Sequence, residues 1–161
     1  EGGVQVNALG KRFNDETGGY SEAAVHVLSQ PGSIAWNIFD APLLELLRSF
    51  PDFRDAEVAG ALRTANTVED LAAIVGCDPA TLKATLDEVR AGHTDSMGRS
   101  FTRSLQGPYH AIKVTGALFH TQGGLEVDAQ CRVVKTNGQT LSNLYAAGGA
   151  ARGVSGRGAD G

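Results

Sequence analysis

Residues that could take part in catalysis or ligand binding gather in the last third of this chain. His120 stands three residues before a pair of glycines, Gly123 and Gly124. A histidine can act as a general acid or base, or hold a substrate oxygen by a hydrogen bond. A glycine pair either forms a tight turn or lets the backbone approach a bulky ligand closely. From these residues alone, His120 is either a functional group beside a ligand or a core histidine under the turn.

Glycines are also concentrated in this region of the chain. The chain has 21 glycines in 161 residues, and many lie after residue 122, including Gly148 and Gly149. Two arginines, Arg152 and Arg157, stand in the same stretch. Each is either an anion ligand or a solvated loop residue. A loop-rich tail without a ligand is the simpler interpretation of the glycines, and composition does not decide between the two.

Two short motifs in the tail do not have the sequence context that their chemistry requires. Residues 156–161 spell GxGxxG, but a dinucleotide fingerprint needs a strand directly before it and a helix after it. The expected strand ends near Ala147, several residues too early. Residues 153–157 resemble a nucleophile elbow, yet Arg157 occupies the position that needs glycine, which argues against a serine hydrolase.

Composition excludes several other classes. The formal net charge is -4, whereas a nucleic-acid partner requires a basic face. No apolar run approaches the roughly 20 residues of a membrane helix. Cys77 and Cys131 are far apart, and no histidine or second cysteine stands at ligand spacing, so we expect no metal site. The simplest interpretation is a reduced, cytoplasmic chain.

Helical patterns dominate the middle of the chain. We expect a short helix over residues 21–28 with Ser21 as its cap, another over 43–47, and a turn or two over 55–62. Thr67 and Asp78 then stand at N-cap positions of two longer helices, with Gly76 ending the first and Gly92 the second.

Strand patterns lie on both sides of these helices. Alternating apolar residues predict strands over residues 3–9 and 33–39, with a return strand starting at 12–13. Further strands are expected over 109–115, 125–128, 131–135 and 144–147. Asn137 and Gly138 predict a hairpin turn between the last two. The chain is therefore of the α+β class.

Four segments together resemble the fumarate reductase/succinate dehydrogenase flavoproteins, including their 3-ketosteroid dehydrogenase relatives. Residues 6–16, VNALGKRFNDE, are similar to that family's VN..GKRF.NE, and residues 116–125, GALFHTQGGL, to its HT.GGL. Residues 65–72, ANTVEDLA, with MGR at 97–99, resemble the family's capping domain. LYAAGG at 144–149 resembles its LYAAGE. Each segment alone is weak, but their common order and spacing make the resemblance specific.

The resemblance implies a fold and a cofactor. It implies the substrate-capping domain of such a flavoprotein, with flanking strands from the FAD-binding domain. Residues 1–13 would be a strand pair of the FAD-binding core, 14–110 the capping domain and 111–161 an incomplete return into the core. The family's nucleotide-binding glycine fingerprint would precede this sequence. We therefore expect an excised piece that is inactive alone and lacks FAD, which the full-length protein would bind.

The resemblance also implies roles for particular residues. His120 matches the family histidine that hydrogen-bonds the substrate beside the flavin, and Thr121 is its neighbour in the motif. Ser155 replaces a family histidine and is expected at the substrate. We expect four glycines to contact the FAD through their backbone: Gly123, Gly124, Gly148 and Gly149.

Two expected catalytic residues depart from the fumarate reductase pattern. Tyr20 stands where fumarate reductases have a proton-donating arginine and 3-ketosteroid dehydrogenases a tyrosine. It is either an acid/base or an ordinary half-buried tyrosine. Arg157 lies two residues before the position of the family arginine that grips a carboxylate. The missing arginine at Tyr20 and the exchange at Ser155 argue against fumarate and leave a ketosteroid-like or other enone or a carboxylate as the substrate.

The expected activity is hydride transfer between flavin and a C=C or CH–CH bond next to a carbonyl or carboxylate. The expected partners are a small-molecule substrate and the rest of the FAD-binding domain. The alternative is a stand-alone, non-catalytic α+β ligand-binding module.

Overall fold

The computed structural model describes the backbone of residues 2–18, 20–117 and 123–153, and their side chains except at 20–22. The chain divides into two compact units. One comprises Glu1–Gly18 with Ala23–Gly116, and the other Gly19–Glu22 with Ala117–Gly161. Within the described ranges, helices are all too short or too polar to cross a membrane. The architecture is mixed, with helices packed on a four-stranded antiparallel sheet and with a separate two-stranded antiparallel sheet.

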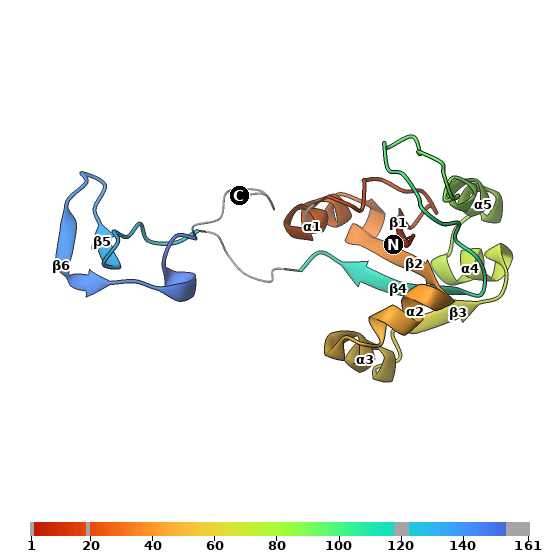
Figure 1. Ribbon diagram of the computed structural model, residues 1–161, viewed down its shortest axis with the longest axis horizontal. Coiled ribbons are helices and arrows are strands. Elements are labelled where there is room, and N and C mark those ends of the chain that lie inside the picture. Colours follow the sequence, from red (N-terminus) through yellow and green to blue (C-terminus); the bar gives the residue numbers. More distant parts are fainter. Residues whose placement is uncertain (1, 19, 118–122, 154–161) are drawn as a thin grey trace. The chain divides into compact units, whose positions relative to one another are not determined.

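A four-stranded sheet forms the centre of the first unit (Figure 1). Its strands are β1 (Val4–Asn7), β2 (Ile34–Asp40), β3 (Leu62–Ala65) and β4 (Tyr109–Thr115), in the order β1-β2-β4-β3. All neighbours are antiparallel. The bounds of β4 are those predicted from the sequence. The sheet places the segment after β1, which carries the GKRF motif, in the same unit as the strand that leads to the HTQGG motif.

Helices cover both faces of this sheet, because successive strand residues point to opposite sides. On one face, α4 (Val68–Val75) and α5 (Pro79–Asp87) pack over Trp36 and Ile38 of β2. On the other face, α2 (Ala41–Leu47) and α3 (Pro51–Val58) pack over Phe39. Because successive side chains of β2 point to opposite faces of the sheet, this strand contributes to two separate hydrophobic cores, one on each face.

The predicted N-caps of α4 and α5 and the predicted end of α4 at Gly76 are confirmed, but α5 ends at Asp87 with Glu88 as its C-cap and does not reach Gly92. The Thr67 hydroxyl accepts the Asp70 N–H at 3.1 Å, and the Asp78 carboxylate accepts the Thr81 N–H at 2.8 Å. Gly76 ends α4 in the left-handed conformation, with φ 83°. These partners lie within one helical turn, so the local sequence suffices to select them.

Other elements differ from the prediction. Helix α1 (Tyr20–Leu28) begins one residue before the expected cap, Ser21, and α3 begins at Pro51 rather than near residue 55. Proline suits a first helical position because its missing N–H costs nothing there. Strand β3 was not expected, because Arg63 and Thr64 are both exposed and break the alternation. Pairing with β4 makes it a strand.

A two-stranded antiparallel sheet forms part of the second unit. It pairs β5 (Arg132–Val134) with β6 (Thr140–Tyr145). The predicted Asn-Gly turn is confirmed, with Gly138 at φ 82° and its N–H bonded to the Lys135 carbonyl at 2.9 Å. The expected strand over residues 125–128 is instead a pair of isolated bridges, one between Leu125 and Ala151 and one between Val127 and Val133.

Candidate functional site

The two glycine segments singled out in the sequence lie side by side in the second unit. The Leu125 N–H donates to the Ala150 carbonyl at 2.9 Å, and the Arg152 N–H donates to the Leu125 carbonyl at 2.8 Å. These bonds form a parallel bridge between Leu125 and Ala151. They place the Gly123–Gly124 pair next to the short 3-10 helix η2 (Gly148–Ala150).

Glycine is required at Gly124 for close backbone approach. An ideal Cβ there would lie 2.4 Å from the Ala151 carbonyl carbon and 2.7 Å from the Arg152 nitrogen. Both atoms belong to the backbone and cannot rotate away. The contact therefore explains why this motif position carries no side chain.

The other glycines have the opposite surroundings. A Cβ at Gly123, Gly148 or Gly149 would meet no described atom within 4 Å, and all three residues are exposed. The space that a side chain would occupy at these positions is therefore available, and a flat, bulky group can approach there closely. The residues present therefore fit a flavin, with the backbones of Gly123, Gly124, Gly148 and Gly149 as its expected contacts.

Most of the predicted side chains lie outside the described residues. These are His120, Thr121, Ser155 and Arg157. Tyr20 is the first residue of α1, and its side chain is likewise outside the description. The roles of all five remain predictions. Within the described ranges, no group of three or more His, Cys, Asp or Glu residues could hold a metal ion.

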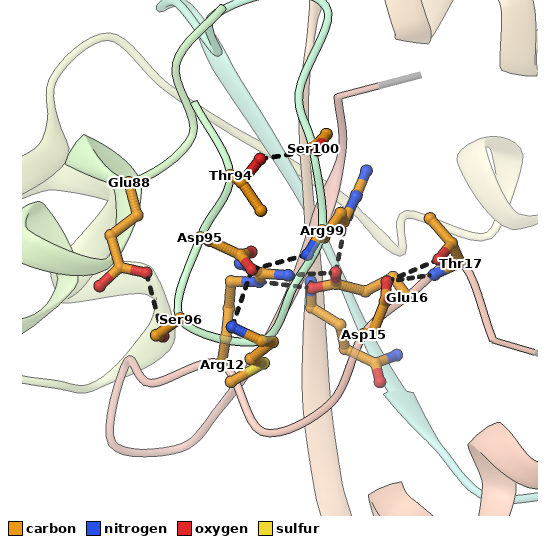
Figure 2. A network of polar contacts seen from close by, with 12 residues as sticks. Arg12, Asp15, Glu16, Thr17, Glu88, Thr94, Asp95, Ser96, Arg99 and Ser100 are labelled. Carbon is orange, nitrogen blue, oxygen red and sulfur yellow. Dashed lines mark hydrogen bonds and ion pairs between the residues drawn. The ribbon is translucent and has the colours of Figure 1, made fainter. Parts of the chain in front are cut away.

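The GKRF segment contributes to a buried ion network in the first unit (Figure 2). The Glu16 carboxylate accepts hydrogen bonds from Arg12 at 2.6 and 2.8 Å, from Arg99 at 2.6 Å and from the Gln5 N–H at 2.8 Å. Arg12 also donates to Asp95. Two segments that carry the family resemblance, residues 6–16 and 97–99, thus meet through one carboxylate.

Each charge in this network stabilises another. Burial raises the pKa of Glu16, but hydrogen bonds from Arg12 and Gln5 outweigh that effect and leave it below its usual range. The pKa of Asp95 is also lowered, because hydrogen bonds from Arg12 and the Arg99 N–H outweigh its burial. Burial lowers the pKa of Arg12, yet its bonds to Glu16 and Asp95 raise it overall.

These shifts argue against an acid–base role for the network. A general acid or base needs a pKa near the working pH, whereas here both carboxylates are held ionised. The two guanidiniums also lie over the Phe101 ring, with Arg12 at 5.4 Å and Arg99 at 4.6 Å from its centroid. A cavity of about 180 Å³ adjoins the network and is lined by Lys11, Arg12, Thr85, Glu88, Ser96 and Met97. We interpret the network as structural.

The partners that organise these sites could not be recognised from the sequence. Arg12 and Glu16 are four residues apart, as are Asp95 and Arg99, but neither pair lies in a helix, where opposite charges at that spacing face one another, so the spacing gave no signal. No signal marks Ala151 either, which crowds Gly124 only after the chain has folded back.

Comparisons with known proteins agree with this arrangement. A family model described as an FAD binding domain matches residues 1–160. The chain is 32% identical over 161 residues to a probable fumarate reductase, Ifc3, of Shewanella frigidimarina, a match that covers 96% of this chain and 27% of that protein.

Solved structures show the same fold. The open conformation of a flavocytochrome c3 fumarate reductase matches with a TM-score of 0.68 and 32% identity, over 95% of this chain and 28% of that one. A 3-ketosteroid delta1-dehydrogenase from Sterolibacterium denitrificans matches with a TM-score of 0.65 and 22% identity, over 94% and 33%. The chain thus spans about a quarter to a third of the length of these three proteins.

Proposed function

Because this chain belongs to the FAD binding domain family, we propose that the protein containing it is a FAD-dependent oxidoreductase. It transfers hydride between the flavin and a C=C or CH–CH bond next to a carbonyl or carboxylate. The observation that supports this most is the pairing of the two glycine segments through Leu125, Ala150 and Arg152. That pairing places Gly124 next to the Gly148–Ala150 turn, where side-chain space at Gly148 and Gly149 is available to a ligand.

The flavin, when bound, supplies the hydride-accepting or hydride-donating centre. The chain's own residues then have two tasks. His120 and Thr121 hold the substrate carbonyl or carboxylate, where negative charge grows during the reaction. Tyr20 exchanges a proton with the carbon next to the one that exchanges the hydride.

The remaining proposed contacts lie in the tail. Arg157 acts as a catalytic anion ligand whose forked donors suit a carboxylate or enolate oxygen, and Ser155 contacts the substrate beside it. We also propose that residues 14–110 cap the substrate, with 1–13 and 111–161 belonging to the FAD-binding core. The partners are thus a small-molecule substrate and the rest of the FAD-binding domain.

The substrate class follows from Tyr20. A neutral phenol cannot supply the fixed positive charge of the arginine found at this place in fumarate reductases, so it gives a dicarboxylate one less cationic partner. A phenol does suit proton exchange at a carbon activated by a ketone. We therefore propose an enone or its saturated ketone as the preferred substrate. The comparisons give no support to a stand-alone, non-catalytic module.

Turnover assays with the full-length protein test the proposal. Fumarate, tricarballylate and a 3-ketosteroid are each supplied with an artificial electron donor or acceptor. We expect bound FAD, and the highest kcat/KM with the ketone. A full-length protein without FAD, or with FAD and no activity on any C=C or CH–CH substrate, would contradict the proposed function. Preference for fumarate would contradict only the substrate class.

A further inference from the structure

Gly116 follows β4 directly and lies in unusually close contact with α1. An ideal Cβ at Gly116 would lie 2.6 Å from the Leu28 Cγ and 2.8 Å from the Ala24 carbonyl oxygen. The backbone of Gly116 is outside the left-handed region, so its conformation would accept other residues. Close packing of the helix is therefore the reason for glycine at this position.

Helix α1 is held to the sheet near this contact. The Ser33 hydroxyl donates to the Leu28 carbonyl at 3.0 Å, and the Thr115 hydroxyl donates to the Ser33 carbonyl at 2.8 Å. Val27 is buried, with 3% of its surface exposed. The C-terminal half of α1 and the end of β4 thus form one packed corner.

The same helix begins at Tyr20. Ala24 lies one helical turn after Tyr20, a distance of about 6 Å along the axis. Because a helical turn is stiff, a shift of the helix at Ala24 moves the backbone of Tyr20 with it. On the other side, His120 lies four residues beyond Gly116 along the chain.

We propose that Gly116 is a positioning residue for the reaction. The missing side chain lets α1 pack against the end of β4, and this contact sets the place of the Tyr20 backbone. The inference rests on the proposed function, in which Tyr20 exchanges the proton. It assigns no chemistry to Gly116, whose effect passes through α1.

Replacing Gly116 by alanine forces the helix to move. The Leu28 side chain can change its rotamer, but the Ala24 oxygen belongs to the backbone and yields only if α1 shifts. A misplacement of about 1 Å at a reacting group can cost roughly a hundredfold in rate. We expect Gly116→Ala to lower kcat per bound flavin by about 10- to 100-fold, with little change in flavin content.

Gly107 offers a matched control at the opposite end of β4. A Cβ there would lie 3.1 Å from the Asn66 backbone oxygen and 3.2 Å from the Tyr109 ring, so Gly107→Ala is also crowded. It is remote from α1 along the strand. We expect Gly107→Ala to cost stability while leaving kcat per bound flavin unchanged.

A double-mutant cycle in the full-length protein tests the path through Tyr20. Tyr20→Phe, Gly116→Ala and the double variant are compared at saturating substrate. If Gly116 acts by placing the Tyr20 hydroxyl, Gly116→Ala should cost less than about threefold once that hydroxyl is gone. A full additive loss in the Tyr20→Phe background, or unchanged kcat for Gly116→Ala, would overturn the inference, as would full activity of Tyr20→Phe.

A second measurement does not depend on turnover. The protein is labelled with 3-fluorotyrosine, and the Tyr20 signal is assigned by its loss in Tyr20→Phe. Gly116→Ala should shift this fluorine resonance and the pH at which it titrates, whereas Gly107→Ala should move neither. If the wild-type enzyme has no activity, the proposed function fails. The fluorine spectrum then decides whether Gly116 positions Tyr20. A Tyr20 resonance that is unchanged in Gly116→Ala overturns the inference.

Discussion

The Glu16 carboxylate lies 2.6 Å from the guanidinium of Arg99, although 83 residues separate the two along the chain. The contact joins the segment after β1 to the loop before β4. The Arg99 guanidinium also donates to the Gly3 carbonyl at 2.8 Å, which ties the same loop to the start of the chain. Through Arg99, Glu16 therefore links the segment after β1, the loop before β4 and the start of the chain in the first unit.

Removing the charge of Glu16 should destabilise the first unit. In Glu16→Gln the guanidiniums of Arg12 and Arg99 lose a buried anionic partner, and breaking such a pair costs about 3 kcal/mol. Urea unfolding of the chain, followed by circular dichroism, measures this. Glu57→Gln is the control, because its pair with Arg48 lies at the surface and should contribute far less. Equal effects of the two substitutions would contradict a structural role for the network.

His110 should make the stability of the chain depend on pH. It is buried and hydrogen-bonded to Thr64 at 3.0 Å. Burial and then Arg48 lower its pKa from the ordinary 6.5, outweighing Asp40 and Glu57. The unfolded chain therefore binds the proton more readily than the folded chain. The stabilisation is complete above pH 6.5 and is lost as the pH falls towards the folded pKa.

Melting temperatures measured between pH 5 and pH 8 check this expectation. His110→Gln keeps a polar group for Thr64 but does not titrate in this range. The melting temperature of the wild-type chain should fall more steeply below pH 6.5 than that of His110→Gln. Parallel curves would show that protonation of His110 does not couple to folding.

Alanine substitutions at Gly10 and Gly60 should distinguish the stability cost of backbone strain from the cost of steric crowding. Both glycines have positive φ, 75° and 76°, but a Cβ at Gly10 would lie 2.8 Å from the Cys77 sulfur, while at Gly60 nothing lies within 4 Å. Gly60→Ala should cost about 1 kcal/mol of unfolding free energy from backbone strain alone. Gly10→Ala should cost at least about 1 kcal/mol more, because the core is overpacked.

A double variant identifies the source of that extra cost. Adding Cys77→Ala to Gly10→Ala removes the crowded sulfur, so the penalty of Gly10→Ala should be smaller in this background than in the wild-type chain. Chemical denaturation gives all four free energies. An unchanged penalty would place the crowding elsewhere, for example at the Leu82 Cβ, 3.4 Å away.

His120 should affect the chemical step in the full-length enzyme. A hydrogen-bond donor that stabilises charge growing in the transition state raises kcat, and its loss lowers kcat roughly a hundredfold. We expect His120→Ala to lower kcat per bound flavin while flavin content stays constant. His93→Ala, in the loop after α5, is the control and should keep wild-type kcat. If His120→Ala instead loses flavin and stability together and its holo fraction turns over normally, His120 is a core residue.

The sequence by itself determined the features whose partners are close along the chain. Helix α4 begins after Thr67 and ends at Gly76, and α5 begins after Asp78. The hairpin turn is made by Asn137 and Gly138. In each case the hydrogen bond closes within a few residues. The bounds of β4 were equally readable, because residues 109–115 form a short run rich in apolar residues between Pro108 and Gly116. Four motifs in one order were sufficient to indicate the flavoprotein family.

Only the tertiary structure decided which distant groups meet. The sequence shows Arg12 and Arg99 as two ordinary cations, and their shared carboxylate at Glu16 exists only after the sheet has brought the two loops together. Strand β3 depends on pairing with β4 more than on its own residues. Gly116 and Gly124 look alike in the sequence, but α1 crowds the first and Ala151 the second. Local propensity cannot select these contacts, because each is a property of two segments that fold against one another.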